Sequence, residues 1–75
     1  MKYLTGKEIS VGDEVLIENG KTSGVIETII ETQKEMEQWN VEETGVLIKA
    51  APFGLVFWPQ SNNDDPVVFK KNENT

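Results

Sequence analysis

The dipeptide Asn19-Gly20 is the feature that most constrains the fold of this 75-residue chain. Asn and Gly both tolerate positive φ, so the pair favours a tight β-hairpin turn wherever extended segments flank it. Residues 14–18 precede it with Val15 and Ile17 on one face, and residues 22–32 follow it with a run rich in Val, Ile and Thr. The sequence therefore predicts an antiparallel hairpin near the start of the chain.

Three further short apolar segments follow, at residues 46–50, 55–58 and 66–69, each bounded by Gly, Pro or polar turn residues. Five strands in so short a chain predict an all-β fold, a small five-stranded antiparallel barrel. We expect one domain over residues 1–70 and a frayed tail at residues 71–75. The alternative architecture is a curved sheet with one short helix, from residues 33–40, packed across it.

Two strands carry further expectations. Gly24, near the start of the second strand, predicts either a bulge or a close approach of two backbone segments. In the fourth strand, if Leu55 and Phe57 face the core, alternation turns Val56 and Trp58 outward. Trp58 would then be either a lid on the barrel end or a contact residue for a partner.

The polar stretch at residues 33–44 admits two interpretations, a mobile loop or one or two helical turns. Thr32 has the side chain of an N-cap, and Glu35 stands at the capping-box position. Met36 and Trp39 lie three residues apart and could pack this excursion onto the barrel. An ordered excursion is therefore the favoured interpretation.

Charge is concentrated between Glu27 and Glu43, a stretch that we call the acidic segment. Six carboxylates and one lysine, Lys34, stand there, in a chain whose net charge is -6. Such a run is either a solvated face that limits aggregation or a surface that attracts a basic partner. Solubility needs only dispersed charge, and concentrating it beside Trp39 costs self-repulsion, which favours the basic partner. The predicted partner-binding residues are Glu31, Glu35, Glu37, Trp39, Glu42, Glu43 and Trp58.

Composition disfavours most other chemistries. The chain has no His, Cys or Arg, and its seven lysines are scattered, so no basic stripe is present to bind nucleic acid. The adjacent acids Glu42-Glu43 and Asp64-Asp65 are a weak signal for catalysis, since neighbours on a strand point to opposite faces. Residues 61–65 lack the spacing of a calcium loop. We expect no enzyme activity, catalytic residue, metal site or cofactor.

The same sequence bears on localisation. The first twelve residues mix charge and polarity, unlike the apolar core of an export signal, and no apolar run approaches membrane-spanning length. The absence of cysteine fits a reducing compartment. We therefore expect a cytoplasmic protein without membrane contact.

The pattern Gly12-Asp13-x-Val15-x-Ile17, followed by Asn19-Gly20 and Gly24-Val25, is similar to the opening hairpin of SH3-like barrels, including KOW-type modules. This resemblance implies an SH3-like fold. It also implies an alternative function, an accessory module that binds a ribosomal or transcription complex through protein contacts around the Asn19-Gly20 loop. RNA-binding KOW modules use basic and aromatic loop residues, whereas this hairpin carries glutamates and no arginine.

Residues 42–48, with the sequence Glu-Glu-Thr-Gly-Val-Leu-Ile, and residues 54–59, with Gly-Leu-Val-Phe-Trp-Pro, resemble small immunity proteins of bacterial polymorphic toxin systems. The resemblance implies a non-enzymatic inhibitor that covers the active site or substrate channel of a cognate toxin. The leading hypothesis is thus a monomer, or a one-to-one heterodimer with a toxin domain that has a basic surface.

Overall fold

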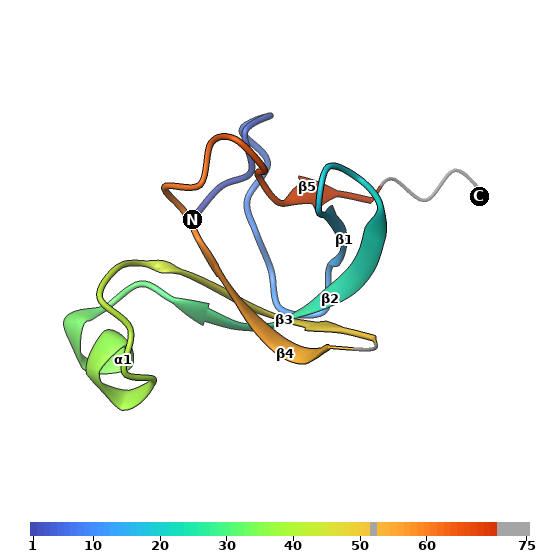
Figure 1. The fold of residues 1–75 in the computed structure, drawn as a ribbon. Coiled ribbons are helices and arrows are strands. Elements are labelled where there is room, and N and C mark those ends of the chain that lie inside the picture. Colours follow the sequence, from blue (N-terminus) through green and yellow to red (C-terminus); the bar gives the residue numbers. More distant parts are fainter. Residues whose placement is uncertain (52, 71–75) are drawn as a thin grey trace.

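The computed structural model describes residues 1–51 and 53–70. Its elements are β1 (Glu14–Ile17), β2 (Thr22–Ile30), α1 (Gln33–Gln38), β3 (Gly45–Ala50), β4 (Gly54–Pro59) and β5 (Val68–Phe69). The strands form one open, antiparallel sheet in the order β4-β3-β2-β1-β5 (Figure 1). The predicted all-β fold of five antiparallel strands is confirmed, and the frayed tail predicted at residues 71–75 lies outside the described residues.

The first hairpin forms where the sequence predicts it. Ile17 pairs with Thr22, and the loop between them places Glu18, Asn19 and Gly20 at φ values of 55°, 58° and 83°. Asn and Gly adopt this left-handed region at little cost, which explains why the chain reverses here.

The long strand β2 bends the sheet, because its first half pairs with β1 and its second half with β3 (Figure 1). Its register shifts between Ile26 and Thr28, so the bulge lies at Glu27 and the bulge predicted at Gly24 is wrong. The alternative prediction for Gly24 is confirmed. A Cβ placed there would lie 3.1 Å from the backbone carbonyl oxygen of Lys49 on β3, and it would overlap Cγ2 of Ile48.

The core lies inside the curl of the sheet. β1, β2 and β3 supply its apolar side chains, and the polar-looking N-terminal segment adds two more, Tyr3 and Ile9, each 5% exposed. A bridge between Lys2 and Glu8 folds that segment into a small hairpin. The buried cluster consists of Tyr3, Ile9, Val15, Ile17, Ile26, Val46, Ile48 and Ala50.

The faces of β4 are the reverse of those expected. Val56 and Trp58 pair with the core residues Ile48 and Val46, so they lie on the core side of the sheet, and Trp58 packs against the core. Leu55 and Phe57 therefore point outward, and Leu55 is 54% exposed. The expectation that Trp58 faces outward is wrong because the strand is apolar on both faces, and alternation alone cannot orient such a strand.

The excursion between β2 and β3 contains the short helix α1, which lies beyond the ends of these strands (Figure 1). The helical interpretation of residues 33–44 is thus confirmed. The alternative architecture, with a helix packed across the sheet, is wrong. Within residues 1–51 and 53–70, no helix is long and apolar enough to cross a membrane.

Candidate protein-binding surface

Two hydrogen-bonded caps hold α1 in place. At its start, the Thr32 hydroxyl accepts from the Glu35 amide at 3.1 Å, and the Glu35 carboxylate accepts from the amides of Thr32 and Glu31 at 3.0 Å. These bonds form the predicted capping box. The backbone N–H of Glu31, followed by the amide and hydroxyl of Thr32, holds the pKa of Glu35 below its ordinary value. The Glu35 carboxylate therefore has a structural role in the N-terminal cap of α1.

The other end of α1 closes in a Schellman motif. Asn40 has a φ of 56°, its amide donates to the Glu37 carbonyl at 3.2 Å, and the Val41 amide donates to the Met36 carbonyl at 2.9 Å. Asn is one of the few side chains suited to that left-handed position. Because both ends are satisfied, the segment that carries Trp39 has a defined backbone path.

The remaining predicted carboxylates spread along the segment. Glu31 accepts from the Met1 ammonium at 2.7 Å, Glu37 accepts from the Gln33 side-chain amide at 3.2 Å, and Glu43 accepts from a serine hydroxyl. All three side chains are exposed, as is Glu42. Among the described residues, no group of three or more acidic side chains is arranged to hold a metal ion.

The two tryptophans have different environments. Trp39 is the C-cap of α1 and is 41% exposed. Trp58, on the core side of β4, donates from Nε1 to the Asp65 carbonyl at 2.7 Å and so fixes the loop that leads to β5. Its neighbour in sequence, Phe57, lies on the opposite face. Of the two tryptophans predicted to bind a partner, Trp39 therefore has an exposed side chain, whereas Trp58 is bonded to the loop that leads to β5.

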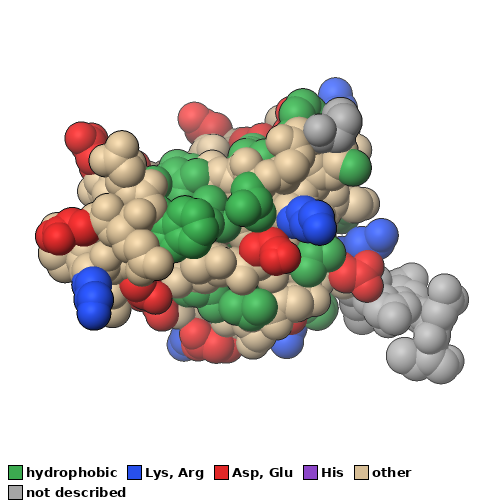
Figure 2. Space-filling view, turned by 90° about the horizontal axis from the view of Figure 1, so that it is seen from below, with side chains coloured by type: hydrophobic (Ala, Val, Ile, Leu, Met, Phe, Trp, Pro, Cys, Tyr) green, Lys and Arg blue, Asp and Glu red, His purple; other side chains and the backbone are tan. Residues whose placement is uncertain are grey.

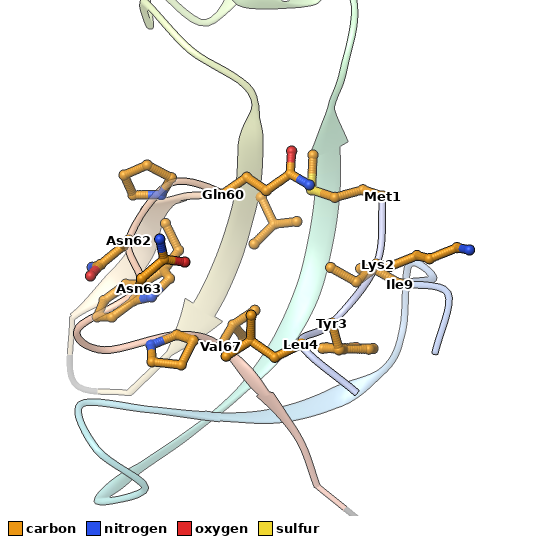
Figure 3. A pocket seen from close by; sticks show the side chains of 13 residues that line it. Met1, Lys2, Tyr3, Leu4, Ile9, Gln60, Asn62, Asn63 and Val67 are labelled. Atoms are coloured by element: carbon orange, nitrogen blue, oxygen red, sulfur yellow. The ribbon is translucent and has the colours of Figure 1, made fainter. Parts of the chain in front are cut away.

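Trp58 also borders a small recess between the N-terminal segment and the loop after β4 (Figure 3). Met1, Tyr3 and Ile9 line it from one side, and Asn62 lines it from the other. Its volume is about 30 Å³, the space of roughly one water molecule. The recess is therefore too small for a metabolite or cofactor.

A larger apolar surface lies on the outer face of the sheet. Cross-strand pairing aligns Val25, Lys49 and Leu55 in one row. The next row contains Leu47 and Phe57. We call the apolar members of these rows the outer patch, consisting of Val25, Leu47, Leu55 and Phe57.

The outer patch is only partly covered. Val25 is 38% exposed and Leu55 is 54% exposed, whereas Leu47 is buried. Glu27 and Lys49 lie beside Leu55 around a shallow depression. Figure 2, which views the molecule from the side of β3 and β4, shows apolar side chains gathered at the centre of this face, with both acidic and lysine side chains beside and around them. An apolar centre with a charged rim is the usual anatomy of a protein interface.

Sequence reasoning missed the outer patch. The signal was present in residues 55–58, a strand that is apolar at every position and therefore has a second apolar face.

The Asn19-Gly20 loop, which the alternative hypothesis makes the binding surface, differs from the outer patch. The Asn19 amide donates to the Asp65 side chain at 2.7 Å, and the Thr22 hydroxyl donates to Glu18, so this loop presents polar groups bonded within the chain.

Comparison of the chain with models of protein families, with curated proteins and with solved structures found no match.

Proposed function

We propose that this chain is a non-enzymatic, protein-binding inhibitor, and specifically an immunity protein that neutralises a cognate bacterial toxin in the cytoplasm. The observation that carries the proposal is the construction of the acidic segment. Caps fix both ends of α1, while Trp39 and the carboxylates of Glu37 and Glu42 remain exposed. An exposed aromatic side chain on a capped backbone segment that also carries exposed carboxylates is suited to recognition, because little backbone entropy is lost on binding.

Electrostatics favours a basic partner. The net charge of -6 repels nucleic acid and anionic membranes, and it attracts a basic protein surface over about a Debye length. The identification of that partner as a toxin rests on the resemblance of residues 42–48 and 54–59 to small immunity proteins.

The test uses the protein encoded by the neighbouring reading frame. We expect its toxin domain to form a one-to-one complex with this chain, seen by native mass spectrometry, and the chain to restore growth of cells that express the toxin. If the two proteins neither associate nor restore growth, the proposal is wrong.

Variants separate recognition from folding. Glu37→Gln combined with Glu42→Gln should weaken the complex about tenfold at low salt, since each exposed charge pair contributes up to about 1 kcal/mol. The matched control, Glu18→Gln with Asp64→Asn, removes the same net charge outside the acidic segment. Equal weakening by both pairs would contradict a role for the segment.

Trp39→Ala tests the aromatic anchor. We expect a loss of binding on the order of 2 kcal/mol, the cost of truncating a hot-spot residue. Val11, which is 64% exposed and lies outside the acidic segment, provides the control Val11→Ala. If Trp39→Ala leaves binding unchanged and lowers only the stability of the free protein, Trp39 is a structural staple.

A further inference from the structure

The sheet has two edges, and they differ in how well they are protected. β5 is two residues long and is followed by Lys70, and the ammonium of Lys7 lies 4.7 Å from the centre of the Phe69 ring. β4 is six residues long and contains no charged residue. Proteins commonly protect edge strands with lysine, bulges or short length, because an open edge pairs with other chains. Only the Pro59 end of β4 carries such protection.

The backbone groups available on β4 follow from its ladder. The Gln60 amide donates to the Thr44 carbonyl at 3.0 Å, and the Trp58 carbonyl points toward Gly45, where a Cβ would approach it to 2.5 Å. The backbone N–H and C=O groups of the even-numbered residues of β4 therefore point toward β3. Because an antiparallel ladder alternates, the N–H and C=O groups of Leu55 and Phe57 point away from β3.

These backbone groups lie next to the outer patch. The side chains of Leu55 and Phe57 belong to it, so an extended segment that adds to β4 gains hydrogen bonds and apolar contact together. Val25, Leu47 and Phe57 continue the apolar surface toward the middle of the sheet. Glu27 and Lys49 both lie beside Leu55, so the charge next to this edge is balanced, and it is the net charge of -6 on the whole chain that favours a basic partner.

We infer that β4 binds an extended segment of a basic protein by strand addition, through the main-chain groups of Leu55 and Phe57, with the apolar side chains of that segment on the outer patch. Strand addition is an established mode of peptide recognition in which main-chain bonds provide affinity and alternate side chains provide specificity. The inference rests on the proposed function, since the partner strand belongs to the basic protein that the chain inhibits.

The probe is a capped peptide of about six residues that alternates valine and lysine. Valine on one side meets the outer patch, and lysine lies on the other side of the added strand. Amide hydrogen exchange by NMR is the measurement. We expect exchange at Leu55 and Phe57 to slow at least tenfold at saturating peptide, with little change at the amides of Val56 and Trp58, which already face β3.

Three controls make the experiment decisive. A peptide methylated on the nitrogens that face β4 should give no protection, because it cannot pair. Leu55→Lys should weaken peptide binding about tenfold, because it replaces an apolar contact with the peptide valines by a charged side chain, whereas Val68→Lys on β5 should leave binding unchanged. Val68 is a matched site because it is 45% exposed on the other edge strand.

Several results would overturn strand addition. These are unchanged exchange at Leu55 and Phe57, equal protection by the methylated peptide, or loss of binding in Val68→Lys but not in Leu55→Lys. Protection that appears without peptide and grows with protein concentration would assign the edge to a second copy of this chain. If the toxin complex forms but the peptide leaves both amides unchanged, strand addition alone fails. If the peptide protects them and no toxin complex forms, the proposed function alone fails.

Discussion

At the scale of single residues, Tyr3 links the N-terminal segment to the rest of the protein. The centre of its ring lies 5.6 Å from the centre of the Phe69 ring, and its hydroxyl donates to the Asp13 carboxylate at 2.8 Å. The same carboxylate oxygen accepts from the Ser10 amide at 3.0 Å. One partly buried carboxylate thus organises the segment that precedes β1.

Tyr3→Phe should lower the free energy of unfolding by about 1–2 kcal/mol, because it removes a hydrogen bond to a charged acceptor and leaves the ring in place. Urea denaturation at neutral pH measures the change. The matched control is Thr5→Val, an exposed polar residue on the same segment. If the two variants are equally stable, the Tyr3 hydroxyl does not hold the segment.

The same residue predicts the alkaline behaviour of the protein. Burial, together with the Asp13 carboxylate, raises the pKa of Tyr3 above its ordinary value of 10.0. The neutral side chain therefore contributes stability that is fully present below pH 10 and is lost as the pH rises above it. Unfolding midpoints measured on either side of pH 10 should fall less in Tyr3→Phe than in the wild type, since lysine titration is common to both.

At the scale of elements, α1 depends on its caps, because a helix of six residues is too short to be stable by itself. Thr32→Ala removes the hydroxyl that accepts from the Glu35 amide, and we expect a loss of about 1 kcal/mol in the free energy of unfolding. Gln33→Ala is the control, since Gln33 is exposed and its side chain donates to Glu37 and not to the cap. Equal effects of the two substitutions in thermal denaturation would contradict a specific role for the cap.

Glu35 adds a pH dependence to the same element. Its pKa is lowered in the folded state, so the stability that its charge contributes is present above its ordinary value of 4.5 and is lost as the pH falls below that value. Glu35→Gln should therefore flatten the fall in stability on acidification, as measured by the unfolding midpoint. Glu42→Gln neutralises an exposed residue outside the cap. In this control the unfolding midpoint should fall with pH as steeply as in the wild type.

The elements also show how far the sequence leads. Thr32 and Glu35 predict α1 because capping is a local interaction, and Asn19-Gly20 predicts the first hairpin for the same reason. The faces of β4 depend on its pairing with β3, and no local signal orients a strand that is apolar at every position. Tyr3 and Ile9 were equally difficult to assign to the core, since their burial depends on contacts with distant strands. The outer patch, which combines three strands, was missed for this reason.

At the scale of the whole molecule, the concentration of charge sets opposite responses of folding and binding to salt. The carboxylates of the acidic segment repel each other in the free protein, and added salt screens that repulsion. The urea midpoint should therefore rise between about 50 and about 300 mM NaCl. Over the same range the complex with a basic partner should weaken, because screening reduces the attraction between the proteins.

The two responses share one cause and should change together. Glu37→Gln with Glu42→Gln reduces both the salt-dependent gain in stability and the salt-dependent loss of binding, whereas Glu18→Gln with Asp64→Asn reduces mainly the general charge effect. Stability is measured by urea denaturation and binding by calorimetry, in the same buffers. A complex whose affinity is independent of salt would show that apolar contact alone drives association. The carboxylates of the acidic segment would then serve solubility, and recognition would depend on the outer patch and the free edge of β4.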